Sequence, residues 1–475
     1  MWQSTDIVQA TTGKTQGVPF VASSVAIDSR KAQNGALFVA IKGERVDGHD
    51  YVKEALAGGA AGALVHRIPK DLHKDAPLIV VNDTYKALVD LGSASRRRTK
   101  AKIIAVTGSV GKTGTKEAIR TALSSSADVY ATHGNLNNHI GLPLSLANLP
   151  PSAHFGVFEM GMNHPGELSF LTRVARPDIA VITNVEAVHL EFFPDIEGIA
   201  DAKAEIIEGL NKDGTLILNR DNRFYDRLVA KAQEQGIRHV VTFGTHAQAQ
   251  CRLVNYTLQD MGARVEAVIH GTPIVYRLGT IGRHWAMTSL AALATSVAVG
   301  ADLADAAAAL AHFHEPDGRG RLHRLQLPQG FATLIDDCYN ASPSSTEAAI
   351  AKLAELGTAL GGGRKIAALG DMLELGTGGA DLHRSLLASL TQQGIDKTYT
   401  AGPLMRHLHD ALPPAMRAVH AASAAALAPT LAADLRPGDL VLIKGSHGSR
   451  MDIVRDALLA SFSTATHPKE SVHAV

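Results

Sequence analysis

Hydrophobic residues occur along this chain in short runs, and polar or amphipathic stretches separate the runs. The first 95 residues contain such runs at 35–41, 62–65 and 78–81. From residue 102 on, aliphatic runs at 103–106, 157–159, 179–183 and 216–218 alternate with helical patterns such as 115–123. Strands that are apolar throughout and alternate with helices are typical of parallel sheets covered on both faces. The pattern therefore predicts an α/β protein with a doubly wound central sheet.

The pattern changes again in the second half of the chain. Residues 253–278 contain two or three alternating segments, which predict a β-rich excursion, and an alanine-rich helix is expected from Trp285. Beyond residues 315–318 (Glu-Pro-Asp-Gly), strands are expected at 332–335, 366–369 and 440–443, and helices at 345–356, 381–390 and 451–462. We therefore expect a small N-terminal α/β domain over 1–98, a central domain over 99–315 and a C-terminal Rossmann-like domain over 316–475.

Length and composition agree with this division and exclude several classes of protein. At roughly 150 residues per domain, 475 residues correspond to about three domains. Lys and Arg (46) balance Asp and Glu (46), and this zero net charge argues against a protein that coats nucleic acid. The two cysteines predict no disulfide framework, which fits a reducing compartment. The arginine run 96–98 is interpreted as part of a solvated linker rather than a phosphate site.

The N-terminal residues lack a basic segment followed by an apolar core, so a signal peptide is not expected. No apolar run reaches the roughly 18 residues of a membrane-spanning helix. We therefore expect a cytoplasmic protein that does not insert into membranes, and we expect a monomer.

The strongest local motif is Gly108-Ser109-Val110-Gly111-Lys112-Thr113, between an expected strand and an expected helix. Glycines allow backbone N–H groups to point at phosphate, the lysine reaches the terminal phosphates, and the threonine can bind Mg²⁺. The fit to a P-loop is incomplete because Val106 occupies the first glycine position. A glycine-rich turn without a ligand is the alternative, and the strand-before, helix-after context favours phosphate binding.

Further candidate groups follow the other expected strands. Glu159 ends one strand, where a carboxylate could bind a phosphate-bound Mg²⁺. The segment from Asn184 to His189 follows the next strand, although a single histidine among 22 is weak evidence. Lys203 lies in an amphipathic helix and reads as a solvated lysine when taken alone. A loop rich in asparagine could be an ordinary polar loop or a patch of neutral donors; its asparagines are Asn135, Asn137 and Asn138.

The order and spacing of these motifs resemble the central ATPase domain of the Mur ligase family. Residues 28–30 (Asp-Ser-Arg) and 47–49 (Asp-Gly-His) look like the nucleotide-sugar domain of that family. Residues 336–343 (DDCYNASP) and 369–376 (LGDMLELG) look like the C-terminal domain of the members that add D-alanyl-D-alanine to UDP-N-acetylmuramoyl-tripeptide. The resemblance extends from about Asp28 to Arg450.

The resemblance implies a role for each matching residue. Gly108, Ser109, Val110, Gly111, Lys112, Thr113, Asn184, His284, Arg319 and Asp337 would bind ATP. Thr113, Glu159, His189 and Lys203 would bind two Mg²⁺ ions, with Lys203 carried as a carbamate. Lys112, Lys203, His189 and Asn138 would act in catalysis. Ser29, Arg30, Asp47, Gly48, His49, Asn135, Asn137, Asn138, Tyr339, Asn340 and Asp371 would contact the substrates. Thr288 departs from the family, because an asparagine that reads adenine usually stands there.

The implied reaction is ATP-dependent amide-bond formation through an acyl phosphate, in the cytoplasmic stage of peptidoglycan synthesis. Because the ATP-binding residues are divided between the central and third domains, closure of the two domains is expected to complete the site. Two alternatives remain open: a sister ligase that adds a single amino acid to a shorter muramyl peptide, and a nucleotide-binding module without ligase activity. A P-loop kinase or GTPase would leave the first hundred residues and the segment 336–343 unexplained.

Overall fold

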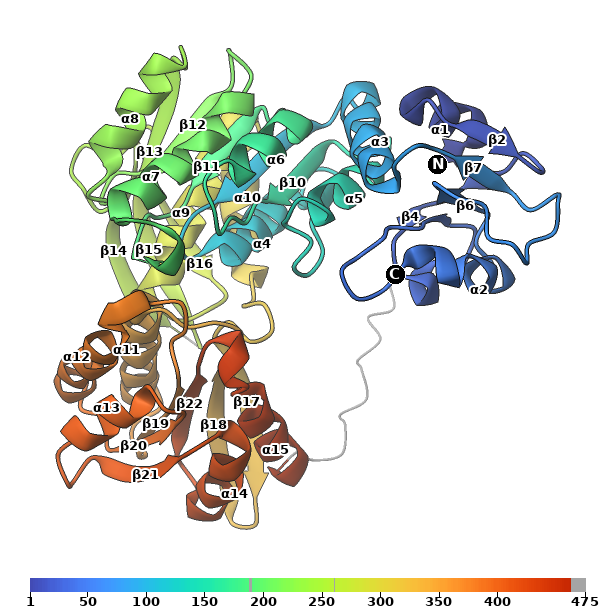
Figure 1. The fold of residues 1–475 in the computed structure, drawn as a ribbon. Helices are drawn as coiled ribbons and strands as arrows, with labels where there is room; N and C mark the ends of the chain where they lie inside the picture. Colours follow the sequence, from blue (N-terminus) through green and yellow to red (C-terminus); the bar gives the residue numbers. More distant parts are fainter. Residues whose placement is uncertain (188–189, 260, 463–475) are drawn as a thin grey trace, which may run out of the picture. The chain divides into compact units, whose positions relative to one another are not determined.

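The computed structural model describes residues 1–187, 190–259 and 261–462. Contacts group the chain into two compact units, which are described separately (Figure 1). The first unit consists of residues 1–185, 197–251 and 291–309, and the second of 186–196, 252–290 and the residues from 310 on.

The N-terminal part of the first unit contains a small sheet in the order β2-β7-β6-β5-β4, in which only β2 is antiparallel to its neighbour. Alternating residues of β5 face opposite sides: Leu37 and Val39 belong to one apolar cluster, and Phe38 to another. Its elements are β1 (Trp2–Gln3), α1 (Ser4–Thr11), β2 (Lys14–Gln16), β3 (Val21–Ala22), β4 (Val25–Ala26), β5 (Leu37–Val39), α2 (Val52–Ala57), β6 (Gly62–Val65), β7 (Leu78–Val80) and α3 (Thr84–Arg98).

The linker expected around Arg96 is wrong, because residues 96–98 belong to a helix, and the expected solvation is wrong for Arg96, whereas Arg97 and Arg98 are exposed. The run forms the last turn of α3, where Arg96 donates to the carbonyl oxygen of Ala175 (2.8 Å) and pairs with Asp178 (3.2 Å). The guanidinium of Arg98 stacks on the ring of Trp2, 3.7 Å from its centroid. Both side chains therefore help to pack α3 within the first unit. The carbonyl acceptor of Arg96 comes from residue 175, far away in the sequence, so the local sequence does not reveal it.

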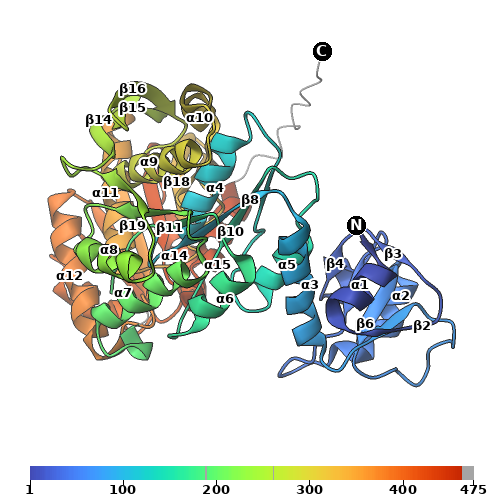
Figure 2. The same ribbon diagram turned by 90° about the horizontal axis from the view of Figure 1, so that it is seen from above.

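The larger sheet of the first unit has the order β13-β12-β11-β8-β10-β9, and all of these strands pair in parallel. Figure 2 shows α4 and α10 on one side of β8, β10 and β11, and α6 and α7 on the other. The elements are β8 (Lys102–Thr107), α4 (Lys112–Leu123), β9 (Val129–Ala131), α5 (Gly141–Ala147), β10 (Phe155–Glu159), α6 (Glu167–Ala175), β11 (Ile179–Ile182), α7 (Ile196–Ala204), β12 (Thr215–Asn219), α8 (Tyr225–Glu234), β13 (His239–Gly244) and α10 (Leu303–Ala309).

The second unit contains a sheet in the order β17-β18-β22-β19-β20-β21, parallel except for the pair β17–β18. Successive residues of β22 alternate between two apolar clusters on its two faces, with Leu440 and Leu442 in one and Val441 and Ile443 in the other. The elements are β17 (Arg321–Leu327), β18 (Gly330–Asp337), α11 (Pro343–Ala359), β19 (Lys365–Gly370), α12 (Gly379–Gln392), β20 (Lys397–Ala401), α13 (Met405–Ala411), β21 (Arg417–Ala421), α14 (Ala424–Asp434), β22 (Leu440–Lys444) and α15 (Asp452–Phe462).

The β-rich excursion expected over 253–278 is confirmed as β14 (Cys251–Gln259), β15 (Gly262–Ile269) and β16 (Thr272–Leu278). The following helix α9 (Arg283–Ala298) begins two residues before the expected Trp285. The small N-terminal α/β region, the doubly wound central sheet and the Rossmann-like C-terminal sheet are likewise confirmed. No helix among the described residues is long and apolar enough to cross a membrane.

Candidate functional site

The glycine-rich loop 108–111 connects the central strand β8 to the N-terminus of α4. Gly108 and Gly111 have φ angles of +151° and +82°, which favour glycine, and the loop can therefore turn directly into the helix. Two bonds fix the loop to the segment after β11: Thr183 Oγ1 donates to the carbonyl of Val110 (2.6 Å), and Ser109 N donates to the carbonyl of Asn184 (2.8 Å). The loop geometry is that of a phosphate-binding turn at a helix N-terminus.

A buried carboxylate at the end of the neighbouring strand β10 binds residues from two other segments. Glu159 is 3 % exposed, and its two carboxylate oxygens accept from Thr113 Oγ1 (2.7 Å) and from Asn137 Nδ2 (2.8 Å). The structure thus brings together a hydroxyl, a carboxylate and an amide that the sequence placed in three separate motifs. Because β8 and β10 are adjacent and parallel, their carboxyl ends meet at one edge of the sheet.

Two lysines of the first unit, Lys112 and Lys203, lie close enough to interact electrostatically, and Lys112 belongs to the loop motif. Lys112 Nζ donates to the carbonyl of Gly108 (2.7 Å). Lys203 is 1 % exposed, and its ammonium nitrogen has no hydrogen-bond or ion-pair partner among the described residues. Burial, and secondarily the charge of Lys112, lower the pKa of Lys203 well below its usual range. A buried lysine with a lowered pKa is a neutral nucleophile for a larger fraction of the time than a solvated one.

The three asparagines of the loop 135–138 lie in different environments. Asn137 reaches Glu159, whereas Asn138 is exposed, and its side-chain oxygen accepts from the backbone N–H groups of Ile140 (3.2 Å) and Gly141 (2.9 Å). Asn135 is exposed. Asn184 accepts at its side chain from Asn222, a partner that the sequence did not suggest. His189 lies outside the described residues.

A third group of expected residues follows the strands of the N-terminal sheet. Residues 28–30 follow β4, and after β5 Asp47 caps a short turn (Gly48–Tyr51) that contains Gly48 and His49. Asp47 accepts from His49 N (3.0 Å) and pairs with Arg67 (2.9 Å), and although burial acts in the opposite direction these bonds hold the pKa of Asp47 well below its usual range. Arg30 is exposed and binds Asp28; Ser29 is half-buried and begins the turn 29–31.

His49 differs from these neighbours because its side chain is inaccessible to solvent. Its Nδ1 contacts Asp47 (2.7 Å), and its Nε2 accepts from the backbone N–H of His66 (3.0 Å). Both ring nitrogens are therefore used within the protein, and burial lowers the pKa of His49. His49 orients the loop that carries Asp47 and Gly48.

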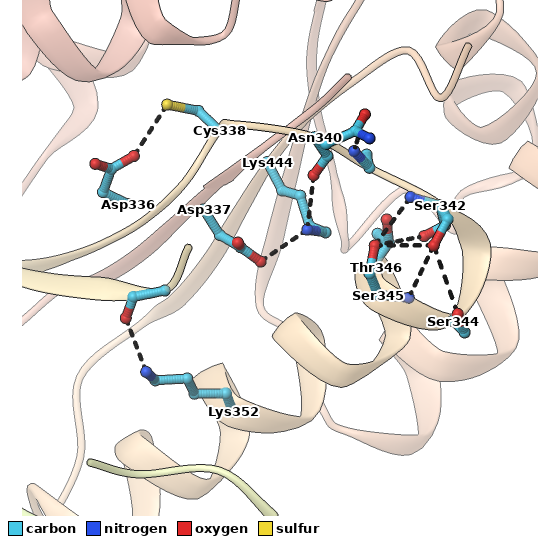
Figure 3. A network of polar contacts seen from close by, with 12 residues as sticks. Asp336, Asp337, Cys338, Asn340, Ser342, Ser344, Ser345, Thr346, Lys352 and Lys444 are labelled. Atoms are coloured by element: carbon cyan, nitrogen blue, oxygen red, sulfur yellow. Dashed lines mark hydrogen bonds and ion pairs between the residues drawn. The ribbon is translucent and has the colours of Figure 1, made fainter. Parts of the chain in front are cut away.

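The second unit places its candidate residues at the carboxyl ends of β18, β22 and β19, which are adjacent in the sheet. Asp337 ends β18 and forms an ion pair (2.7 Å) with Lys444, whose side chain is only 2 % exposed (Figure 3). Lys444 Nζ also donates to the carbonyl of Asn340 (3.1 Å). Burial raises the pKa of Asp337, while the nearby cations Lys444 and Arg319 oppose that shift.

Two further contacts organise this edge. The guanidinium of Arg319 stacks on the ring of Tyr339, 4.2 Å from its centroid. Asp371, which follows β19, is 5 % exposed and accepts from the backbone N–H of Met405 (2.8 Å). Ser446 Oγ accepts from Leu373 N (2.9 Å) and thereby ties the loop after β22 to the loop after β19.

The first turn of α9 belongs to the same unit and carries His284. Enclosure by protein and the nearby cations Lys352 and Lys444 lower the pKa of His284, although part of the residue is accessible to solvent. Thr288 donates from its hydroxyl to the carbonyl of His284 within the helix (3.0 Å).

Sequence reasoning missed several residues of these sites. Lys444 and Ser446 directly follow the apolar strand β22, and the rule that polar residues at strand ends form sites could have identified them. Lys116 and Thr132 are also missed: Lys116 Nζ donates to the carbonyl of Thr132 (2.6 Å), and Thr132 Oγ1 accepts from Glu159 N (3.2 Å). No local signal distinguishes these two from surface residues.

Comparison with known proteins identifies the family to which this chain is similar. The Mur ligase middle domain matches residues 106–296, and the model described as Mur ligase, glutamate ligase domain matches 320–447. The model described as Mur ligase family, catalytic domain matches 22–96. The UDP-N-acetylmuramoyl-tripeptide–D-alanyl-D-alanine ligase of Bacillus subtilis is 35 % identical over 471 residues, which are 96 % of this chain and 98 % of the relative.

The chain belongs to the Mur ligase family. The ligase of the same description from Escherichia coli is 36 % identical, over 84 % of this chain and 85 % of its own length. Among solved structures, MurF from Acinetobacter baumannii has a TM-score of 0.83 at 28 % identity and covers 97 % of this Mur ligase and 99 % of its own chain. MurF from Thermotoga maritima, solved in complex with ADP, has a TM-score of 0.77 at 27 % identity, with 92 % of this chain and 96 % of its own covered.

Proposed function

We propose that this protein is an ATP-dependent ligase that joins D-alanyl-D-alanine to UDP-N-acetylmuramoyl-tripeptide in the cytoplasmic stage of peptidoglycan synthesis, acting as a monomer. Similarity over nearly the whole chain to relatives of that description supports the substrates. The observation that carries the chemistry is the contact of Thr113 and Asn137 with the buried Glu159, next to the glycine-rich loop and Lys112.

The reaction needs ATP because an amine cannot expel oxide from a free carboxylate. Transfer of the γ-phosphoryl group to the carboxylate breaks its bond to ADP and forms an acyl phosphate. The amine of the dipeptide then attacks the acyl carbon, loses a proton, and phosphate leaves. In this scheme the N–H groups of the loop 108–111 and the ammonium of Lys112 stabilise the negative charge on the transferring phosphoryl group.

Mg²⁺ is the metal that suits the residues of this site. The hydroxyl of Thr113 and the carboxylate of Glu159, 2.7 Å apart, are hard oxygen donors of the kind Mg²⁺ prefers. Mg²⁺ neutralises phosphate charge when bound. We assign Thr113, Glu159, His189 and Lys203 to two such sites.

Lys203 is proposed to carry a carbamate. An ammonium beside Mg²⁺ and Lys112 would be repelled, whereas the neutral amine favoured by burial can add to CO₂ and lose a proton to give an anionic oxygen pair. The test is carbon-13 NMR of the protein in ¹³C-bicarbonate, with Lys203→Met as the control. A carbamate signal in the wild type that disappears in the variant is the expected result, and equal spectra would contradict the assignment.

The remaining roles concern the second unit. His284, Arg319 and Asp337 are proposed to bind the nucleotide, the last through the ribose. Tyr339, Asn340 and Asp371 are proposed to line the dipeptide side. In the N-terminal sheet, Ser29, Arg30, Asp47 and Gly48 are proposed to bind the nucleotide sugar, while His49 holds their loop.

The deciding experiment measures phosphate release from ATP in the presence of UDP-N-acetylmuramoyl-tripeptide. D-Alanyl-D-alanine and single amino acids are added in turn, and the product is identified by mass spectrometry. Release that depends on the dipeptide is expected. Release driven only by a single amino acid would identify a sister ligase, and nucleotide binding without release under any condition would identify a binding module.

A further inference from the structure

One face of helix α11 carries a lysine that is buried together with its partners. Lys352 is 2 % exposed, and its Nζ donates to Glu315 Oε1 (2.5 Å) and to the backbone carbonyl of Gly320 (2.8 Å). The Glu315 side chain is only 8 % exposed. Figure 3 shows Lys352 pointing from α11 to a main-chain carbonyl on the neighbouring segment. Burial of an ammonium is costly unless it is paired, and here a carboxylate and a carbonyl are its partners.

The same face of α11 reaches a second segment. Glu315 also accepts from the hydroxyl of Thr280. Glu355, one turn beyond Lys352, accepts from the hydroxyl of Tyr256 (3.3 Å), and that hydroxyl accepts from the backbone N–H of Gly282 (2.6 Å). The turn 280–282 is therefore held twice, once through Glu315 and once through Tyr256.

The two segments held in this way are the ones that carry proposed nucleotide-binding groups. Gly320 directly follows Arg319, and Gly282 lies two residues before His284. The backbone at Gly318 and Gly320 has φ angles of +72° and +96°, so the chain around Arg319 turns sharply and depends on its anchors for its path. A Cβ atom at residue 320 would lie 3.3 Å from Lys352 Nζ, which indicates how closely the loop packs on the lysine.

We propose that Lys352, paired with Glu315, is a positioning residue that holds the loop of Arg319, and with Tyr256 and Glu355 the turn before His284, in the geometry that binds nucleotide. The inference rests on the proposed function only in taking the ligand to be ATP. Lys352 itself touches no substrate in this scheme. It acts through Gly320 and Glu315, and its loss should weaken nucleotide binding selectively.

The test is isothermal titration calorimetry on the full chain with the β,γ-methylene analogue of ATP and, separately, with UDP-N-acetylmuramoyl-tripeptide. Lys352→Met retains the length of the side chain and removes its charge and hydrogen bonds. We expect about tenfold weaker binding of the analogue and a change of less than about twofold for the tripeptide. Lys365→Met is the matched control, because Lys365 is a half-buried lysine of the same unit whose Nζ donates only to the carbonyl of Gln393 (3.0 Å), and it should change neither affinity.

A cycle with Arg319→Ala separates positioning from general destabilisation. If Lys352 acts partly through Arg319, adding Lys352→Met to Arg319→Ala should weaken analogue binding by less than about threefold further, because only its effect on the turn before His284 remains. A further loss of about tenfold in that background, or equal losses for both ligands in Lys352→Met alone, would overturn the proposal.

Two additional variants keep the test decisive. The double variant Glu315→Gln with Lys352→Met leaves no unpaired charge, so it replaces Lys352→Met if the single variant does not fold. The same selective loss of affinity for the ATP analogue is expected. Tyr256→Phe removes the partner of Gly282 N–H and should also weaken the analogue selectively; unchanged binding in it would limit the role to the Arg319 loop and contradict the proposal as stated. A wild type that binds the analogue but makes no dipeptide product would refute the proposed function while leaving this measurement valid.

Discussion

The junction between the glycine-rich loop and strand β11 can be tested by adding one methyl group. A Cβ atom at residue 108 would lie 1.9 Å from Thr183 Oγ1 and 3.1 Å from the backbone nitrogen of Asn184, and φ there is +151°. Thr183 Oγ1 is not free to move, because it donates to the carbonyl of Val110 (2.6 Å). Gly108→Ala must therefore displace Thr183, break that bond and adopt a strained backbone.

The magnitude follows from these separate costs. Backbone strain of this kind costs about 1–3 kcal/mol, and the overpacked methyl group costs about 1–3 kcal/mol. The lost hydrogen bond adds about 1 kcal/mol. Because the costs overlap when the loop relaxes, we expect a loss of about 4 kcal/mol in the free energy of unfolding. A loop displaced at Ser109 and Val110 also presents its N–H groups poorly, so kcat/KM for ATP should fall at least about tenfold.

The measurement is urea denaturation of the full chain, combined with phosphate-release kinetics. Gly134→Ala is the matched control, since φ is +57° there and a Cβ would meet nothing within 4 Å. It should lose only about 1 kcal/mol, from backbone strain alone. Gly108→Ala combined with Thr183→Ala removes the clash and should recover part of the loss. Equal stability of the two alanine variants would refute the reasoning.

Three further predictions concern the loop lysine, the arginine run and a buried histidine. Lys112→Ala should reduce dipeptide-dependent phosphate release at least about hundredfold, and near-normal release would place the phosphate site elsewhere. Arg96→Ala should lower the free energy of unfolding by about 2 kcal/mol, because the arginine side chain is 14 % exposed and bound to carbonyls, whereas the exposed Arg97→Ala should cost less than about 0.5 kcal/mol in the same urea titration. Burial lowers the pKa of His49 below its unfolded value of about 6.5, so the unfolded chain takes up the proton first as the pH falls and stability is lost below about pH 6.5. His49→Gln should flatten that decline below about pH 6.5, and a decline as steep as that of the wild type would contradict it.

The sequence predicts where polar groups meet, since the carboxyl ends of neighbouring parallel strands lie at one edge of the sheet. The loop after β8, the end of β10 and the segment after β11 were each recognised as a polar stretch that ends an apolar run. Since these three strands are neighbours and run in parallel, their ends share one edge of the sheet. The same rule applies at β18 and β19, where Asp337 and Asp371 were identified.

Individual side-chain partners could not be predicted, since they depend on segments far apart in the chain. Thr113 and Glu159 are 46 positions apart, and neither motif indicates that their side chains touch. Arg96 reads as a solvated residue because its acceptors come from the end of α6. His49 reads as a candidate ligand for substrate, and only its burial against Asp47 and His66 indicates that both of its ring nitrogens are occupied.

The described residues include several buried lysines, and their partners show how the protein accommodates an ammonium group away from solvent. Four lysines are at most 2 % exposed: Lys116, Lys203, Lys352 and Lys444. Three of them pair with both a backbone carbonyl and a carboxylate: Lys116 with Thr132 and Glu117, Lys352 with Gly320 and Glu315, and Lys444 with Asn340 and Asp337. These partners offset part of the cost of burying each ammonium group.

Lys203 is the exception, because the described residues offer its nitrogen neither a carbonyl nor a carboxylate, and its charged neighbour is Lys112. An ammonium in that position would be buried without a partner and would therefore be destabilising. A carbamate reverses the sign of the group, which turns the repulsion by Lys112 into attraction and adds an oxygen donor for a cation. The contrast with the other three lysines therefore supports a modified Lys203 on grounds of charge alone.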